Sequence, residues 1–165
     1  DAWFMEEAGP IRIILGPQDD YFSSSSIETF LTAKYTVTTE TDRMGIRLDG
    51  PKLEHSRGYN IVSDGIVTGA IQVPGTGQPI LLLADHQTTG GYPKLGTVIS
   101  GDISRLGLLC PGEEITFLQI TVGEAEQILA EQELKIKTAI ENFKPADPWL
   151  DYQALYNENL ISGFI

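Results

Sequence analysis

Short apolar segments separated by proline and glycine turns constrain the fold of this chain more than any other feature of its sequence. Each segment holds about five residues, mostly β-branched, aliphatic or aromatic, as is typical of β-strands. The segments lie at residues 11–15, on both sides of "DRMG" within 34–51, and at 59–63, 69–73, 79–85, 95–100 and 113–121. Strands this short and this numerous predict a mainly β protein that forms a closed or nearly closed barrel.

Helices accompany the predicted strands. The first is predicted to begin at Ser25, because Glu28 follows it at the spacing of a capping box. A short helix is predicted near 102–109 and a long one at 122–143. The long helix carries apolar side chains on one face, namely Ala125, Ile128, Leu129, Ile136, Ala139, Ile140 and Phe143. We expect this face to pack on the barrel, with a contact to another molecule as the alternative. The aromatic and acidic segment beyond Pro145 is expected to dock on the chain itself or on a partner.

Composition narrows the class of protein. A chain of 165 residues, 41% of them hydrophobic, fits one domain with one core. The net charge of −12, without a cluster of lysine and arginine, argues against nucleic-acid binding and against attraction to anionic membranes. The single cysteine permits no disulfide within the chain and favours a cytoplasmic protein. No segment has the pattern of a membrane span or signal peptide, and Asp1 as first residue predicts a piece of a longer protein.

Several chemistries lack the residues they need. His55, His86 and Cys110 do not stand at metal-ligand spacing, so we expect no metal site. The chain has no GxSxG elbow, no Walker A loop and no GxGxxG after a strand. Cys110, just before a Pro-Gly turn, is expected to be a buried structural thiol. His86 follows Asp85, but neighbours on an extended strand point to opposite faces and do not form a pair.

The segment "LLLADHQTTGGYPKLG" (81–96) places many small and polar groups beside a buried strand. With the residues before it, this segment brings polar side chains to the ends of neighbouring predicted strands: Gln72, Gln78, Asp85, Gln87, Thr88, Thr89, Tyr92 and Lys94. Strand ends are where a barrel gathers polar groups around a pocket. Gly90 and Gly91 permit backbone conformations closed to other residues and let a ligand approach their N–H groups. A plain turn between strands explains the same composition equally well.

Longer stretches carry a more specific signal. They are "LGPQDDYF" (15–22), "SIETFLTAKYTVTTETDRMGIRLDGP" (26–51), "SDGIVTGAIQVPGTGQPILLLADHQTTGGYPKLGTVISGDISRL" (63–106) and "PGEEITF" (111–117). Together they resemble the KipA family, also called allophanate hydrolase subunit 2, which includes the C subunit of 5-oxoprolinase and the carboxyltransferase part of biotin-dependent urea carboxylases. Many members carry arginine where this chain has His86, which indicates that a charge there is not required.

The resemblance implies a cyclophilin-like β-barrel with short helices and a long C-terminal helix, in agreement with the strand pattern. It places the barrel at residues 1–122 and the helix and tail, packed on the barrel or on a partner, at 123–165. Family members also carry an N-terminal half of similar size with its own glycine-rich segment. The resemblance therefore implies that this chain is the C-terminal half of a two-part unit.

The activity implied by the resemblance is biotin-dependent carboxyl transfer, or ATP-dependent hydrolysis of 5-oxoproline, on a small amide such as urea or 5-oxoproline. The implied partners are the missing N-terminal half and a sister subunit of the KipI type, which corresponds to the B subunit of 5-oxoprolinase. No cofactor is expected to bind this chain directly, since biotin on a carrier or ATP would act through the wider complex. The alternative is a regulatory module without catalysis, which binds a KipI-like partner and relieves its inhibition of a kinase.

Both implied reactions develop charge on an oxygen whose carbon bears nitrogen, so they need hydrogen-bond donors more than a nucleophile. On this basis Lys94 stabilises the oxyanion, and Asp85 accepts a proton or a substrate N–H, with capping of its own loop as the alternative. Gln87 completes the catalytic set by donating and accepting hydrogen bonds. The expected substrate-binding residues are Gln72, Gln78, Thr88, Thr89, Gly90, Gly91, Tyr92, Arg43 and Arg47. The two arginines are candidate anion contacts or, alternatively, surface ion-pair partners.

Overall fold

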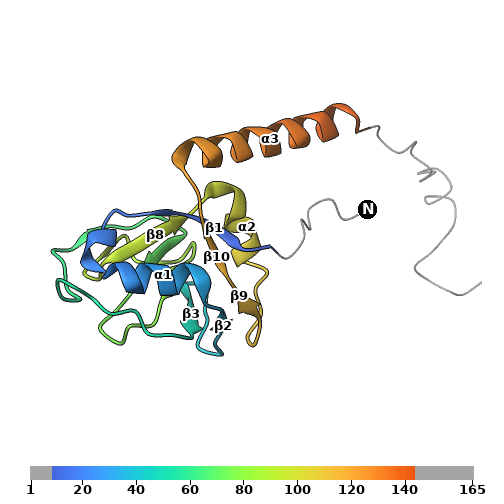
Figure 1. Cartoon of the computed structure of the whole chain (residues 1–165). Coiled ribbons are helices and arrows are strands. Elements are labelled where there is room, and N and C mark those ends of the chain that lie inside the picture. The colour runs from blue at the N-terminus through green and yellow to red at the C-terminus, as the bar shows by residue number, and fades with distance from the viewer. Residues whose placement is uncertain (1–8, 144–165) are drawn as a thin grey trace, which may run out of the picture. The chain divides into compact units, whose positions relative to one another are not determined.

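The computed structural model describes residues 9–143 (Figure 1). The chain divides into two compact units, Asp1–Ala130 and Glu131–Ile165. The first unit contains all the strands of the described residues and the short helices. The described part of the second unit is the C-terminal part of a long helix.

An eight-stranded sheet forms the first unit, in the spatial order β10, β1, β8, β5, β6, β3, β2, β9. Its strands are β1 (Ile11–Leu15), β2 (Tyr35–Val37), β3 (Gly45–Asp49), β5 (Ala70–Gln72), β6 (Ile80–Leu82), β8 (Lys94–Val98), β9 (Glu114–Ile115) and β10 (Phe117–Gln119). Neighbouring strands pair antiparallel, except that β1 and β10 are parallel. A separate two-stranded sheet pairs β4 (Asp64–Gly65) with β7 (Thr89–Gly90).

The two edges of the large sheet belong to one continuous segment, residues 114–119. β9 pairs Ile115 with Tyr35 of β2, and β10 pairs Phe117 with Ile11 of β1. Only Thr116 separates these strands, and its carbonyl accepts a hydrogen bond from the Ile11 N–H at 2.8 Å. The sheet therefore curls into a nearly closed, cyclophilin-like barrel, which confirms the predicted fold class.

Two of the expected strands differ from the structure. Residues 59–63 form no strand, because the Ile61 N–H donates to the Gly91 carbonyl at 2.8 Å and Val62 is 92% exposed. The strand in this region is β4, which begins just after the expected segment. The expected strand at 113–121 is two strands, since its halves pair with opposite edges of the sheet.

The helices are η1 (Asp19–Tyr21), α1 (Ser24–Thr32), η2 (Ser100–Asp102), α2 (Ile103–Leu106) and α3 (Val122–Glu141). The predicted start of the first helix at Ser25 is wrong, because Ser23 is the N-cap and its hydroxyl accepts from the Ser26 N–H at 3.1 Å. Ser23 has the extended backbone that an N-cap needs, whereas Ser25 already lies inside the helix. A run of consecutive serines offers the same cap chemistry at several positions, so spacing alone chose the wrong one.

An aromatic cluster lies at the centre of the core. Phe30 of α1 stacks on Phe117 of β10 with ring centroids 4.3 Å apart, and its ring lies 5.6 Å from that of Tyr35 in β2. The Tyr35 hydroxyl donates to the Pro51 carbonyl at 3.1 Å, and burial raises the pKa of Tyr35 to about 12. The cluster thus joins α1 to β2 and to β10, which belong to opposite ends of the strand order (Figure 1).

A buried carboxylate fixes α2 to β1. The Asp102 side chain is fully buried and accepts from the Arg12 backbone N–H at 2.8 Å, from Nε at 3.0 Å and from Nη2 at 2.6 Å. Arg105 Nη1 donates to the same carboxylate at 3.2 Å. Burial by itself would raise the pKa of Asp102, but the hydrogen bonds and charge of Arg12 outweigh it and hold this pKa below its usual range. The short helix α2 is therefore held by a charged clamp as well as by packing.

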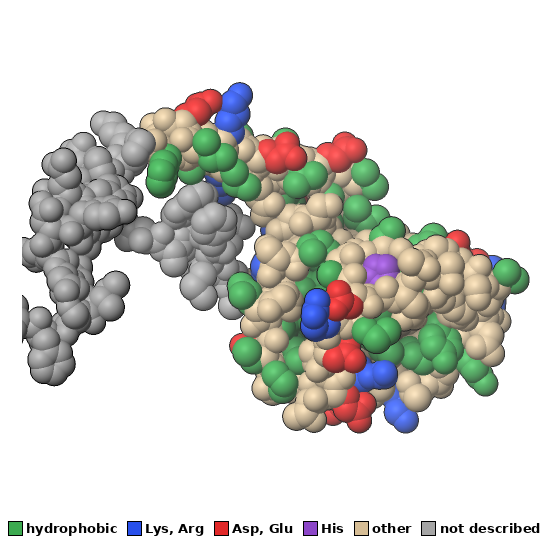
Figure 2. All heavy atoms as spheres, turned by 180° about the vertical axis from the view of Figure 1, so that it is seen from behind, with side chains coloured by type: hydrophobic (Ala, Val, Ile, Leu, Met, Phe, Trp, Pro, Cys, Tyr) green, Lys and Arg blue, Asp and Glu red, His purple; other side chains and the backbone are tan. Residues whose placement is uncertain are grey.

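The long helix α3 begins at a capping box, because the Glu124 side chain accepts from the Thr121 N–H at 2.7 Å and the Thr121 hydroxyl accepts from the Glu124 N–H at 3.3 Å. None of its described side chains is buried, and Figure 2 shows hydrophobic side chains along it. The packing of its apolar face stays a prediction, and the docking expected beyond Pro145 lies outside the described residues. Within residues 9–143, no helix has both the length and the apolar character needed to cross a membrane.

Truncation of Phe117 tests the aromatic cluster. We expect Phe117→Ala to lower the free energy of unfolding by about 3–5 kcal/mol, because it removes the ring stacked on Phe30 and leaves a cavity. Leu118, the next residue, is 47% exposed, and Leu118→Ala is expected to cost less than about 1 kcal/mol. Urea denaturation of the two variants measures both values, and equal losses would contradict this account of the core.

Candidate functional site

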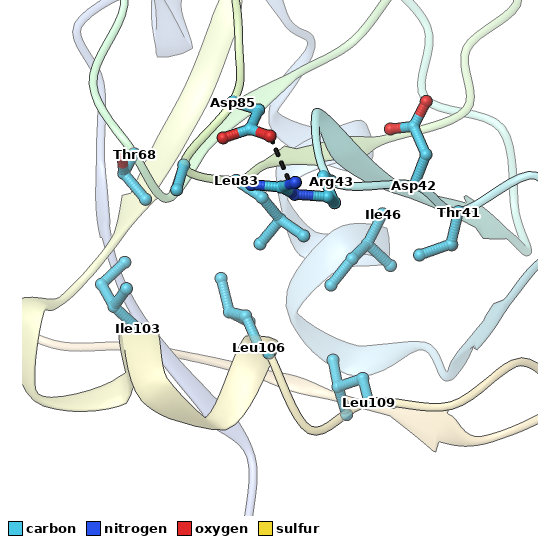
Figure 3. A pocket seen from close by; sticks show the side chains of 12 residues that line it. Thr41, Asp42, Arg43, Ile46, Thr68, Leu83, Asp85, Ile103, Leu106 and Leu109 are labelled. Atoms are coloured by element: carbon cyan, nitrogen blue, oxygen red, sulfur yellow. Dashed lines mark ion pairs between the residues drawn. The ribbon is translucent and has the colours of Figure 1, made fainter.

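A cleft of about 500 Å³ opens on the first unit between the turn before β3, the loop after β6, and α2 (Figure 3). Its inner surface is apolar and is formed by Ile46, Leu83, Ile103, Leu106 and Leu109. Polar and small residues complete the lining, namely Thr41, Asp42, Arg43, Thr68, Ala84, Asp85 and Gly107. Two of the residues singled out in the sequence, Arg43 and Asp85, therefore lie at one site.

Arg43 and Asp85 form an ion pair at this cleft, with Nε and Oδ2 2.9 Å apart (Figure 3). The Asp85 N–H also donates to the Arg43 carbonyl at 3.2 Å, so backbone and side chains both join the two segments. The side chains are 88% and 45% exposed, and within the described residues neither has another partner. The Nη groups of Arg43 and Oδ1 of Asp85 are therefore available as donors and acceptor for a ligand.

The turn that presents Arg43 is built by the residue before it. Asp42 Oδ1 accepts from the N–H groups of Met44 at 2.8 Å and Gly45 at 3.1 Å. A carboxylate that accepts from backbone N–H groups two and three residues on is the usual way for aspartate to stabilise a turn. The "DRMG" sequence thus explains both the tight connection into β3 and the exposure of the Arg43 side chain.

Lys94 does not line the cleft. Its side chain is 4% exposed, and Nζ donates to Asp64 Oδ2 at 2.6 Å and to the Gly65 carbonyl at 2.8 Å. Gln18 completes this cluster, since its Nε2 donates to Asp64 at 3.2 Å and its Oε1 accepts from the Lys94 N–H at 3.1 Å. The hydrogen bonds from Lys94, from the Gly65 N–H and from Gln18 lower the pKa of Asp64. The geometry thus gives Lys94 a partner within the fold, and its catalytic role stays a prediction.

The position of Gln72 beside Gly90 gives a different reason for the Gly90-Gly91 pair from the one expected from the sequence. Gln72 is buried, its amide lies 3.5 Å from the Tyr92 carbonyl, and a Cβ at Gly90 would approach Gln72 Nε2 to 2.5 Å. Neither Gly90 nor Gly91 has a positive φ angle, so the expectation of special backbone conformations there is wrong. A Cβ at position 90 would also meet Ile66 Cδ1 at 2.6 Å, so a larger residue there would require one of these two side chains to shift. The predicted contact of Gly90 with a substrate stays a prediction.

The other predicted site residues lie outside this cleft. Gln87, Thr88, Thr89 and Tyr92 are exposed around the β4–β7 pair. Gln78 Nε2 donates to the Gly50 carbonyl at 3.1 Å, whereas Arg47 lies 3.9 Å from Glu40 as an exposed ion pair. Their assigned roles stay predictions, because nothing in the arrangement brings them together with Arg43 and Asp85.

The structure differs from the sequence expectation at Cys110. Cys110 is exposed, so the expected buried thiol is wrong; the Pro-Gly turn that follows lies at the surface. His86 Nδ1 lies 2.6 Å from the Gln87 carbonyl. Residues 84–85 form a turn rather than an extended strand, so the alternation of side chains expected there for Asp85 and His86 is wrong. Within residues 9–143, no three His, Cys, Asp or Glu side chains are grouped to hold a metal ion.

Sequence reasoning missed two parts of this region. Asp64 is the partner of Lys94, and the signal was the segment "SDG", which the family resemblance includes at 63–65. The apolar lining from α2 was also missed, although "DISRLGLL" was expected to form a helix there. On the face seen in Figure 2, lysine and arginine side chains lie near acidic ones and form no extended basic patch.

The fold and the cleft define a class of protein: a nearly closed β-barrel domain with a donor and an acceptor at the mouth of an apolar cleft. The family model "Carboxyltransferase domain, subdomain A and B" matches residues 2–119, and the chain belongs to this family.

Sequence similarity to individual proteins supports this assignment. The chain is 35% identical over 123 residues to the C subunit of 5-oxoprolinase from Escherichia coli K12, a match that covers 74% of this chain and 40% of the relative. The corresponding Haemophilus influenzae protein is 36% identical over 129 residues, with 76% and 42% covered. The chain thus spans about two fifths of the length of these relatives.

Solved structures agree as well. The Kluyveromyces lactis urea carboxylase has a TM-score of 0.75 at 28% identity, and the match covers 84% of this chain and 13% of that one. The urea amidolyase of the same yeast has a TM-score of 0.73 at 28% identity, with 83% and 9% covered. The matches support the fold over most of the described barrel.

Replacement of Asp64 tests the role of its contact with Lys94. We expect Asp64→Asn to lower the free energy of unfolding near neutral pH, because buried Lys94 loses its counter-charge. A carboxylate with a lowered pKa stabilises the fold above its ordinary pKa of 3.8 and loses this contribution as pH falls through the lower folded value. Urea denaturation should therefore show the gap between wild type and variant closing as the pH drops below 3.8.

Asp20 supplies the control for this measurement. Its pair with Arg57 is exposed on both sides, so Asp20→Asn should change stability little at any pH. A gap between wild type and Asp64→Asn that does not depend on pH would contradict the assigned contact.

Proposed function

We propose that this chain is the barrel part of a carboxyltransferase or 5-oxoprolinase assembly that acts on a small amide. The observation that carries the proposal is the Arg43–Asp85 pair at the mouth of the cleft. Its residues come from two segments far apart in the sequence, and the fold brings them together beside an apolar surface. Membership of the carboxyltransferase domain family and the similarity to the C subunit of 5-oxoprolinase support the same chemistry.

The donor and acceptor at the cleft complement an amide. Urea and lactams present a carbonyl oxygen and an N–H on the same side of the molecule. Arg43 Nη groups donate to the carbonyl oxygen, while Asp85 Oδ1 accepts the N–H. The existing bond between Arg43 Nε and Asp85 Oδ2 holds the two side chains next to each other at the mouth of the cleft.

The same groups assist the reaction. Attack of water on the amide carbon places negative charge on the amide oxygen. In carboxyl transfer the nitrogen attacks the carboxyl donor, and loss of its N–H proton places negative charge on the same oxygen. A guanidinium directed at that oxygen stabilises the charge in both reactions. Asp85 orients the nitrogen and accepts its proton when the nitrogen acts as a nucleophile. In this proposal Arg43 takes the oxyanion role expected of Lys94 from the sequence, because the Lys94 ammonium is bonded to Asp64 inside the fold.

The co-substrates of the reaction, ATP or carboxylated biotin, are proposed to be bound by other parts of the assembly. The carboxylates of Asp42 and Asp85 at the cleft do not suit a triphosphate, so ATP is assigned to a sister subunit of the KipI type. Biotin would be carried by another domain. The partial coverage of each relative supports a role for further domains or subunits, including an N-terminal half.

Arg43→Gln and Asp85→Asn in the complete assembly test the proposal. We expect each to lower kcat/KM by about 100-fold or more, because each removes a group that contacts the developing charge or the nitrogen. The pair is exposed, so both variants should remain folded. Arg57→Gln is the matched control, since Arg57 is an exposed arginine with an acidic partner outside the cleft.

The assays are ATP-dependent release of glutamate from 5-oxoproline and biotin-dependent consumption of urea. Wild-type turnover in both cleft variants would refute the site. If the wild-type assembly binds its sister subunit but turns over neither of these substrates nor another small amide such as a lactam, the regulatory module is the better interpretation.

A further inference from the structure

We infer that the cleft selects a neutral lactam, with its hydrocarbon ring on the apolar surface, over both urea and 5-oxoproline. The inference rests on the proposed function, because it takes Arg43 and Asp85 as the amide-binding groups. It adds the chemical class of the substrate, which follows from what surrounds these groups.

The apolar surface argues against urea. Leu83, Ile103 and Leu109 line the cleft and are partly exposed, whereas Ile46 and Leu106, which also line it, are 1% exposed (Figure 3). Urea has no C–H surface to bury there, so it leaves this lining in contact with water. A ligand whose methylene groups cover the lining gains from every CH₂ that leaves water.

The geometry of the pair argues for a ring. An open-chain secondary amide prefers the trans form, in which the N–H and the carbonyl point in opposite directions. Such an amide meets Arg43 or Asp85, but not both at once. A small lactam is locked with both groups on one side, so it reaches donor and acceptor together without loss of conformational freedom.

The charges at the mouth argue against a carboxylate on the ring. Asp42 and Asp85 both line the cleft, and Arg43 is the one basic residue among its lining residues. A substrate carboxylate would compete for the donors of Arg43 and would lie close to like charges. The cleft thus disfavours 5-oxoproline relative to the same ring without its carboxylate, 2-pyrrolidinone.

Binding of small probes to the complete chain tests the first two steps. The probes are 2-pyrrolidinone, N-methylacetamide and urea. Their binding is detected by NMR of methyl-labelled isoleucine and leucine side chains. We expect 2-pyrrolidinone to shift the methyl signals of Leu83, Ile103 and Leu109 and to bind about tenfold more tightly than the other two, from partial burial of its methylene groups. Equal affinity for urea, or shifts confined to other methyl groups, would overturn the inference.

Adjacent leucines provide the matched variants. Leu109 lines the cleft, whereas Leu108 is 66% exposed and does not. Leu109→Ser should abolish most of the preference for 2-pyrrolidinone over urea, and Leu108→Ser should leave it unchanged. Equal effects of the two variants would mean that the ring does not sit on this surface.

Asp42 tests the charge argument. Asparagine keeps the Oδ1 that accepts from Met44 and Gly45, so Asp42→Asn preserves the turn while removing a charge. We expect wild type to prefer 2-pyrrolidinone to 5-oxoproline by several-fold at low salt, and less at high salt. Asp42→Asn should reduce this preference, whereas Asp49→Asn, at an exposed residue of β3 outside the cleft, should not.

The two levels of the proposal fail separately. If the lactam binds as expected but Arg43→Gln and Asp85→Asn retain full turnover, the catalytic role is wrong while the selectivity stands. If these variants lose turnover but urea or 5-oxoproline binds better than 2-pyrrolidinone, the site stands and the selectivity is wrong.

Discussion

Closure of the sheet by residues 114–119 is the constraint on which the rest of the barrel depends. One short segment supplies both edge strands, so the register of β9 on β2 and that of β10 on β1 cannot change independently. The Ile11 N–H bond to Thr116 lies at the junction. Because Phe117 follows this junction directly, closure also sets the position at which Phe30 of α1 stacks. A barrel edge closed in this way exposes few backbone groups to other chains.

The polar residues near Gly90 and Gly91 separate into two groups because of strand pairing. β7 pairs with β4, which places Asp64 and Gly65 over Lys94 and commits its ammonium to the fold. Asp85 lies before this pairing begins, in a turn that hydrogen bonds to the backbone of Arg43. A continuous motif in the sequence therefore serves two purposes: its second half maintains the β4–β7 region, and its first half contributes to the cleft.

Periodicity and turn residues predicted the barrel because they act locally. The apolar run "IRIIL" and the alternating segment "GIRLD" formed strands at the expected places, and "DRMG" formed the tight connection. Residues 59–63 have the same composition but find no free strand edge, so their hydrogen bonds go to a loop. The pairing of Arg43 with Asp85 was not predictable, since it follows from the register of β3 on β6, with Gly45 opposite Leu82. Both residues were candidates, but only long-range register makes them neighbours.

The walls of the cleft are fixed by interactions that do not involve the ion pair itself. Asp102 holds α2 to β1, and Gly69, whose φ is +86°, leaves no room for a Cβ because Ile103 Cδ1 lies 2.5 Å from where it would be. The β3–β6 ladder positions the two loops at the mouth. The Arg43–Asp85 pair is exposed and contributes little to stability, so its side chains can reorient toward a ligand at small cost. A rigid apolar surface below a readily rearranged donor and acceptor is the arrangement that favours binding of a preorganised ring over a flexible amide.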